Sequence, residues 1–149
     1  MEQTANDSII AQIRKEFYSM RNGIVAETLR KGGLEQKYIF GLQLPQIKSI
    51  AERYRPESDQ EGADIARTLW RDRNCREARL LACHLMPSAC ISREEAEQWA
   101  ADTTTREEAD ILAFRLLRYL PFSADIADTL QTDGSALATY TAEAIRRFI

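Results

Sequence analysis

The spacing of apolar residues along the chain is the sequence feature that most limits its fold. Residues such as Ile9, Ile10, Ile13 and Phe17 recur at helical intervals, and this pattern continues almost from end to end. The apolar–polar alternation typical of strands is nearly absent. We therefore predict an all-α chain of eight or nine short helices.

The turn residues divide this pattern into segments. Asn6 or Asp7 is the expected cap of a first helix, and SREEA at Ser92 and TREEA at Thr105 are capping boxes, in which a hydroxyl residue is followed three positions later by Glu. The expected helices, besides the first and the one that starts at Ser92, cover about 22–31, 45–54, 59–72, 76–85, 105–120, 123–130 and 135–149. Short turns and no linker favour stacked helical hairpins in a single domain, 1–149, an α-solenoid. A globular bundle is the alternative.

Composition narrows the class of protein. The 149 residues are 44% hydrophobic and 29% charged, which is typical of a folded protein. No apolar run approaches a membrane span, and the N-terminus has no signal-peptide pattern, so we expect a cytoplasmic protein without a membrane partner.

Cys75, Cys83 and Cys90 include no close pair at metal spacing, and His84 has no partner ligands. We expect no metal and no cofactor.

Two further pairs of residues resemble functional motifs. Trp70 and Trp99 lie among apolar neighbours at helical spacing, so they are predicted to be core residues. Cys83 and His84 are the residue types of a nucleophile and its base, but adjacent helical residues point about 100° apart. We interpret their proximity in the sequence as incidental.

The positive charge is concentrated in one window. The net charge is −3, so nucleic-acid binding would need a local basic patch. Sixteen of the twenty positive residues are Arg, the side chain that binds phosphate bidentately. The most basic window is RTLWRDRNCREAR, in which the candidates for phosphate contact are Arg67, Arg71, Arg76 and Arg79. A solvated surface of salt bridges is the alternative interpretation.

An acid stands on the apolar side of the helix predicted for 105–120. Steps of about 100° place Asp110 and Arg106 within the same arc as Ala109, Ala113, Phe114, Leu116, Leu117 and Leu120. Glu107 and Glu108 are expected on the solvent side. Asp110 can be an acid favoured by the helix dipole and paired with Arg106, or a functional carboxylate. The spacing alone leaves both interpretations open.

Four segments in order resemble a known family. They are FGLQLPQIKSIAERY (40–54), LW (69–70), REARLLA (76–82) and WAAD followed by Asp110. Together they are similar to the AlkD-like DNA alkylation repair family of HEAT-like helical-repeat proteins. The resemblance implies a superhelix of helical pairs with a basic concave face for double-stranded DNA. Its active members are glycosylases that excise N-alkylated purines.

The resemblance also implies a site. The family has a Trp four residues before a catalytic Asp, and by spacing these positions are Arg106 and Asp110. A carboxylate stabilises the positive charge that grows on the sugar as the base leaves, and an aromatic ring holds the cationic base. Asp110 is therefore the catalytic candidate, and Arg106 joins the DNA-binding candidates. Because Arg cannot replace the ring, we predict weak or absent excision.

The C-terminal end differs from the family as well. The chain is shorter than typical members, and Arg146 or Arg147 is the candidate for a basic residue that the family directs at DNA. Tyr140, Ile145, Phe148 and Ile149 are apolar without a polar cap after them, which predicts a homodimer through this helix.

The sequence thus predicts a DNA-binding protein of the alkylation repair family, with weak or lost N-alkylpurine glycosylase activity. A non-enzymatic helical-repeat scaffold for protein partners is the alternative, favoured by the acidic net charge and the missing Trp.

Overall fold

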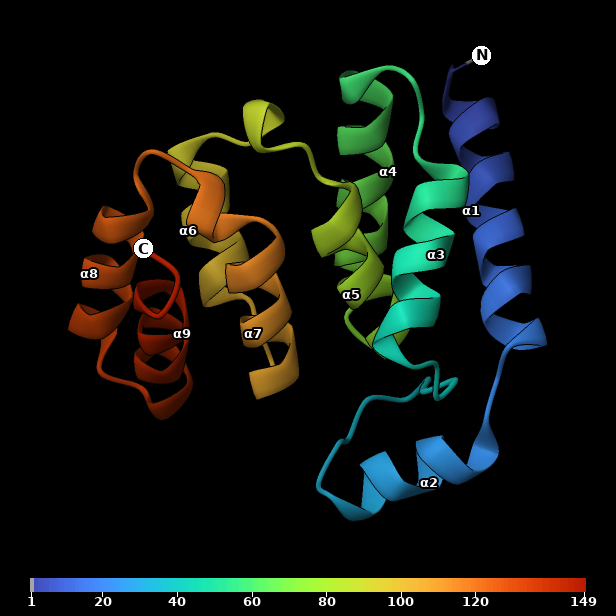
Figure 1. Cartoon of the computed structure of the whole chain (residues 1–149), viewed down its shortest axis with the longest axis horizontal. Helices are drawn as coiled ribbons and strands as arrows, with labels where there is room; N and C mark the ends of the chain where they lie inside the picture. The colour runs from blue at the N-terminus through green and yellow to red at the C-terminus, as the bar shows by residue number, and fades with distance from the viewer. Residues whose placement is uncertain (1) are drawn as a thin grey trace. The chain divides into compact units, whose positions relative to one another are not determined.

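The computed structural model describes residues 2–149, with side chains described from residue 5 onward. The described residues form helices and turns, and their only strand-like pairing is an isolated bridge between Tyr38 and Cys75. The predicted all-α class is confirmed (Figure 1). The chain divides into an N-terminal unit, which ends at Leu85, and a C-terminal unit, Met86–Ile149. None of the described helices is long and apolar enough to cross a lipid bilayer.

Five helices make up the N-terminal unit. They are α1 (Glu2–Ser19), α2 (Gly23–Lys31), α3 (Leu44–Tyr54), α4 (Asp59–Arg71) and α5 (Arg76–Leu85). Figure 1 shows α1, α3, α4 and α5 side by side, and their packed faces form the core of the unit. The short α2 contributes no buried residue to that core. Trp70 lies in the core with 4% of its surface exposed, as predicted.

The C-terminal unit holds four α-helices and two short 3-10 turns. They are η1 (Ser88–Cys90), α6 (Arg93–Ala101), α7 (Arg106–Arg115), η2 (Leu117–Tyr119), α8 (Ser123–Asp133) and α9 (Ala136–Arg146). Gly134, at φ +79°, ends α8 in the left-handed conformation and turns the chain back so that α9 packs against α8 as a helical hairpin. Such hairpins are the local unit of HEAT-like repeats. Trp99 is buried here, also as predicted.

Side-chain caps start several of the helices where the sequence predicted them. Ser92 Oγ accepts the N–H of Glu95 at 3.1 Å, and Thr105 Oγ1 accepts the N–H of Glu108 at 3.1 Å. Each such cap contributes about 1 kcal/mol to helix stability. The start of α7, and with it the orientation of the helix that carries the candidate acid, is therefore fixed by local chemistry.

Three sequence predictions were wrong in detail. The first helix begins at Glu2, and Asn6 lies inside it, one turn before Ile10 on the buried face. The helix predicted for 105–120 ends at Arg115. Leu116, at φ −131° and ψ −62°, leaves the helical conformation, and η2 follows. Pro121 disfavours helical backbone at Leu120, which is extended, and Leu116, Leu117 and Leu120 all stay buried.

The third correction concerns Glu108, which was expected in solvent. Its side chain is buried, and its carboxylate accepts the Thr104 backbone N–H at 2.9 Å. The Thr104 hydroxyl lies 3.2 Å from both carboxylate oxygens. Glu108 therefore closes the start of α7 through Thr104, and not through the Thr105 N–H that a complete capping box would use.

The irregular segment before α3 is held by one buried carboxylate. Glu77 Oε1 accepts the backbone N–H of Phe40 at 3.0 Å, and Oε2 accepts that of Gly41 at 3.1 Å. Oε2 also accepts the Leu42 N–H at 3.4 Å and lies 2.6 Å from Arg76 Nη1. Glu77 is fully buried, and its charged carboxylate ties this segment to α5 and the core.

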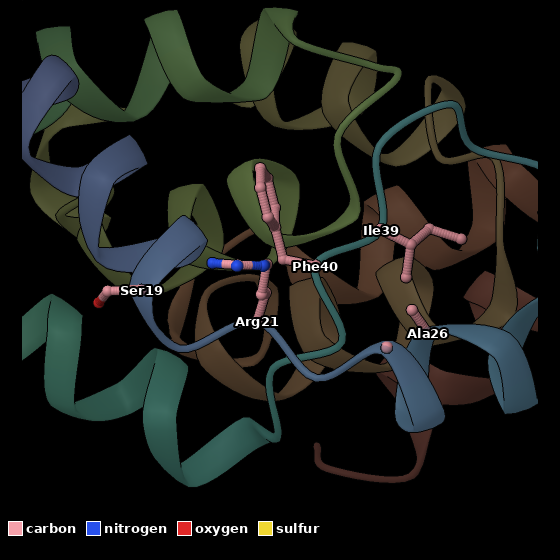
Figure 2. A pocket seen from close by; sticks show the side chains of 6 residues that line it. Ser19, Arg21, Ala26, Ile39 and Phe40 are labelled. Atoms are coloured by element: carbon pink, nitrogen blue, oxygen red, sulfur yellow. The ribbon is translucent and has the colours of Figure 1, made fainter.

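The glycine in that segment allows a close approach to α2. Gly41 has φ +84°, and a Cβ atom there would lie 2.2 Å from the backbone oxygen of Asn22. The Asn22 N–H donates to the Phe40 carbonyl at 2.7 Å, which fixes the start of α2 against the segment. Figure 2 shows the pocket at this junction, where Arg21 lies beside Phe40 and Ile39 beside Ala26. No residue predicted to bind DNA lines this pocket.

Cys75, at the entry to α5, is closed off from solvent. Only 4% of its surface is exposed, and burial, as the largest cause, raises the pKa of its thiol to about 12. The thiol therefore stays protonated near neutral pH. Cys83 and His84 each contact a backbone carbonyl one turn earlier, of Arg79 and Leu80.

Candidate active site

Asp110 occupies the second turn of α7 and is held by a side chain from α9. The Tyr140 hydroxyl oxygen lies 2.9 Å from each carboxylate oxygen, so its hydrogen is shared between them. The Asp110 side chain is 42% exposed. The hydroxyl therefore orients the carboxylate while part of its surface stays open to an incoming molecule.

Arg147 is the cation that faces Asp110. Its Nη1 lies 4.0 Å from Asp110 Oδ1, and its side chain is 54% exposed. Arg146 points elsewhere and pairs with Asp128 of α8 at 2.5 Å. Adjacent residues at the end of a helix diverge by about 100°, which is why one neighbour approaches the acid and the other does not. Of the two candidates that the sequence left open, Arg147 is the one beside the acid.

Arg106 stacks on a ring instead of pairing with the acid. Its guanidinium carbon lies 4.8 Å from the centroid of the Tyr140 ring, a cation–π distance. Among the described residues the ion-pair partner of Asp110 is Arg147. The helical Arg106–Asp110 pair, one of the two interpretations of the sequence, does not form.

Tyr140 is the site residue that the sequence analysis did not assign to the site. The hydrogen bond to Asp110 is the largest cause that raises the pKa of its hydroxyl, with burial and the charge of Asp110 next. Arg147 acts in the opposite direction. Tyr140 and Arg147 are seven residues apart, which places them on one face of a helix. That spacing is the signal in the sequence that could have identified the pair.

A comparison with known families identifies the family of the chain. A family model described as DNA alkylation repair enzyme matches residues 13–136. The chain belongs to the DNA alkylation repair enzyme family. No curated protein and no solved structure gave a match. The match covers parts of both units and includes Arg106 and Asp110, and it stops before Tyr140 and Arg147.

The predicted phosphate contacts of this DNA alkylation repair family member divide into two groups. Arg71 is exposed, and its side chain has no hydrogen bond or ion pair among the described residues. Arg67 is partly exposed and lies 3.5 Å from Asp64. Both remain candidates for DNA contact.

The other two arginines of the same window are internal. Arg76 is 4% exposed and donates to the Leu42 carbonyl at 2.9 Å, besides its pair with Glu77. Arg79 is fully buried, donates from Nε to the Trp70 carbonyl at 2.9 Å, and stacks on the Trp70 ring at 4.0 Å. A buried guanidinium cannot reach a phosphate group, so we leave Arg76 and Arg79 out of the proposed DNA contacts.

The last residues are only partly available for the predicted dimer. Ile145 is fully buried inside the C-terminal unit, whereas Phe148 and Ile149 are 36% and 55% exposed. Tyr140 is engaged with Asp110 and Arg106. The exposed apolar surface at this end therefore includes Phe148 and Ile149 but not Ile145.

Proposed function

We propose that this protein binds double-stranded DNA and that Asp110 excises N-alkylated purines from it at a slow rate. The proposal rests on the exposure and the contacts of the Asp110 carboxylate. The carboxylate is 42% exposed, it is oriented by the Tyr140 hydroxyl, and it lies 4.0 Å from a cation that can contact phosphate. Part of the carboxylate surface therefore stays free to contact a ligand.

The chemistry requires little of the protein beyond a fixed negative charge. In an N-alkylated purine the base is cationic, and when the C1′–N bond breaks, the electron pair leaves with the base, which becomes neutral. The positive charge that develops on the sugar is stabilised by Asp110. Water then adds to C1′ and loses a proton, which leaves an abasic site. Asp110 can accept that proton.

Arg106 is the reason for the slow rate. The π face of Tyr140 could hold a cationic base, but the Arg106 guanidinium already lies over it at 4.8 Å. Its charge also repels a cationic base from the neighbourhood of Asp110. The protein thus has the acid of a glycosylase, but a cation already occupies one face of the neighbouring ring.

DNA contact is supported by the exposed arginines. In the N-terminal unit the candidates for phosphate contact are Arg71, whose side chain has no internal partner among the described residues, and Arg67. In the C-terminal unit they are Arg106 and Arg147. The N-terminal unit has fourteen Lys and Arg against twelve Asp and Glu, whereas the C-terminal unit has six Arg against eleven acids. Phosphate binding is therefore mainly a property of the N-terminal unit, and the chemistry belongs to the C-terminal unit.

The test is the release of N7-methylguanine from methylated duplex DNA, followed over hours by mass spectrometry. The unmodified protein should release the base above the spontaneous rate. Asp110→Asn should lower the enzymatic rate about 100-fold, the usual cost of removing one electrostatic contact to a transition state. Asp133→Asn is the matched control, because Asp133 caps the Ser135 N–H and an amide oxygen retains that bond. Release unaffected by Asp110→Asn would refute the proposed role.

A further inference from the structure

Aromatic and arginine side chains gather where α7 and α9 end. The rings of Phe114 and Phe148 meet edge to face, with centroids 5.3 Å apart and planes at 65°. The guanidinium carbon of Arg118 lies 4.3 Å from the Phe114 centroid, 4.5 Å from that of Tyr119 and 5.6 Å from that of Phe148. Arg115 approaches Phe114 at 5.2 Å. We call these five residues the arginine–aromatic patch.

The patch presents its rings to solvent. Tyr119 is 60% exposed and Phe148 is 36% exposed. Arg118 Nε is enclosed and has no hydrogen-bond partner among the described residues, so contact with the rings takes the place of hydration at that atom. Exposed rings are unfavourable in water, and an enclosed donor without a partner adds to the unfavourable terms. A surface of this kind gains free energy when a ligand covers it.

The patch continues from the candidate active site. Phe114 follows Asp110 by one turn on α7, so the two residues lie on the same side of the helix. Phe148 directly follows Arg147, whose guanidinium faces Asp110. A molecule on the patch therefore reaches the carboxylate without leaving the C-terminal unit.

The charges of the patch point to nucleic acid as its ligand. Its five residues carry two positive charges and no carboxylate, although the C-terminal unit as a whole has an excess of acids. Proteins bind unpaired nucleotides with aromatic side chains that stack on bases and with cations that contact the backbone. A paired base cannot stack on a protein ring, because its faces are covered by its neighbours in the duplex.

We propose that the arginine–aromatic patch binds an unpaired nucleotide of duplex DNA, with the base on Tyr119 and Phe148 and the phosphate on Arg115 and Arg118. The inference rests on the proposed function, since it takes DNA as the partner. It adds a preference: the protein selects duplexes that contain an unpaired nucleotide and brings that nucleotide next to Asp110. The protein then recognises first that a nucleotide is unpaired, and not that its base carries an alkyl group.

The test compares two labelled duplexes of the same sequence, one fully paired and one with a single unpaired nucleotide, by fluorescence anisotropy with the full chain. The duplex with the unpaired nucleotide should bind about tenfold more tightly, the size of one stacked base. Tyr119→Ala should abolish this difference and leave the affinity for the paired duplex unchanged. Phe148→Ala should reduce it. Circular dichroism checks that both variants remain helical.

Tyr18→Ala is the matched control. Tyr18 is also 60% exposed, and the Arg21 guanidinium lies 3.9 Å from its ring centroid, so it reproduces the Tyr119–Arg118 contact in the N-terminal unit. Tyr18→Ala should preserve the tenfold preference. A loss as large as that of Tyr119→Ala would overturn the proposal, because any exposed tyrosine would then suffice.

Three other outcomes would also overturn it, and they are distinguishable. Equal affinity of the unmodified protein for the two duplexes would refute the patch while leaving DNA binding intact. No binding to either duplex would refute the proposed function and the patch together. Self-association in sedimentation that Tyr119→Ala abolishes would assign the patch to a second copy of the chain.

Discussion

Two carboxylates, one in each unit, are held differently. Glu77 in the N-terminal unit is fully buried and receives three backbone N–H groups and Arg76. Asp110 in the C-terminal unit is 42% exposed, and its neighbours are one hydroxyl and one arginine at 4.0 Å. Glu77 uses its charge to fix the backbone of the segment before α3. Asp110 retains lone pairs that no donor among the described residues occupies.

The difference separates a structural charge from a reactive one. A buried carboxylate stabilises the fold only while every partner is present, so its removal leaves the partners unpaired. A half-exposed carboxylate contributes little to the fold, because water competes with its partners. The same type of group should therefore affect stability in one unit and activity in the other.

The largest expected effect tests this division directly. Glu77→Gln leaves the buried Arg76 without its charge partner and turns an amide NH₂ toward backbone N–H groups. We expect a loss of about 3 kcal/mol in the free energy of unfolding, measured by urea denaturation. Asp110→Asn should cost less than about 1 kcal/mol in the same experiment. Equal losses of unfolding free energy in the two variants would contradict the division into a structural and a reactive carboxylate.

The next effect concerns the rate of excision. Arg106→Trp replaces the cation near Asp110 with a ring, and we expect release of N7-methylguanine to rise about tenfold, in the range of a partly desolvated cation–π contact. Arg106→Ala removes the repulsion without supplying the ring, so its gain should be smaller. The double variant with Asp110→Asn should be inactive. A gain that survives in the double variant would show that Asp110 is not the reactive acid.

A smaller effect separates exposed from buried arginines within one sequence window. Arg71→Gln should weaken DNA binding and reduce the slope of log K against log salt by about 1, since each phosphate contact releases about one counterion. The slope is measured by anisotropy at several salt concentrations. Arg30→Gln, in α2, is the control, because Arg30 donates to the Gln36 and Lys37 carbonyls instead of facing outward unpaired. An unchanged slope in Arg71→Gln would exclude Arg71 from the interface.

The smallest effect is in the titration of Tyr140. Its pKa is raised, chiefly by the hydrogen bond to Asp110, so Asp110→Asn should lower it toward the ordinary value of about 10. Because the folded-state pKa is the higher one, the hydroxyl contributes stability below about pH 10 that is lost as the pH rises through the raised pKa. The difference in tyrosinate absorbance between the unmodified protein and Tyr140→Phe isolates this group. An unshifted titration in Asp110→Asn would mean that the contact does not persist in solution.

The features that the sequence predicted depend on neighbours along the chain. The starts of α6 and α7 followed from Ser92 and Thr105 with a Glu three residues later, and the period of 3.6 residues placed Leu116, Leu117 and Leu120 in the core. The break at Leu116 was not predicted, because no proline or glycine marks it in the sequence and Leu116 fits the apolar period of the helix. Local rules therefore located the helices but not this interruption.

The missed features of the site depend on distant residues. Tyr140 and Asp110 are thirty residues apart, and only the packing of α9 on α7 brings them together. Similarly, the charge of RTLWRDRNCREAR does not distinguish Arg71, which is exposed, from Arg79, which stacks on Trp70 inside the core. A sum of charges records how many cations a segment has, but not which of them can meet a ligand.

The burial of Cys75 protects its thiol from chemical modification. Methylating and other electrophilic agents that damage purine bases also attack thiols, and they react with the thiolate. A thiol that is 4% exposed, with a pKa raised to about 12, offers these agents almost no nucleophile. The N-terminal unit can therefore keep its helix junction intact during exposure to the reagents whose products a DNA alkylation repair enzyme would meet.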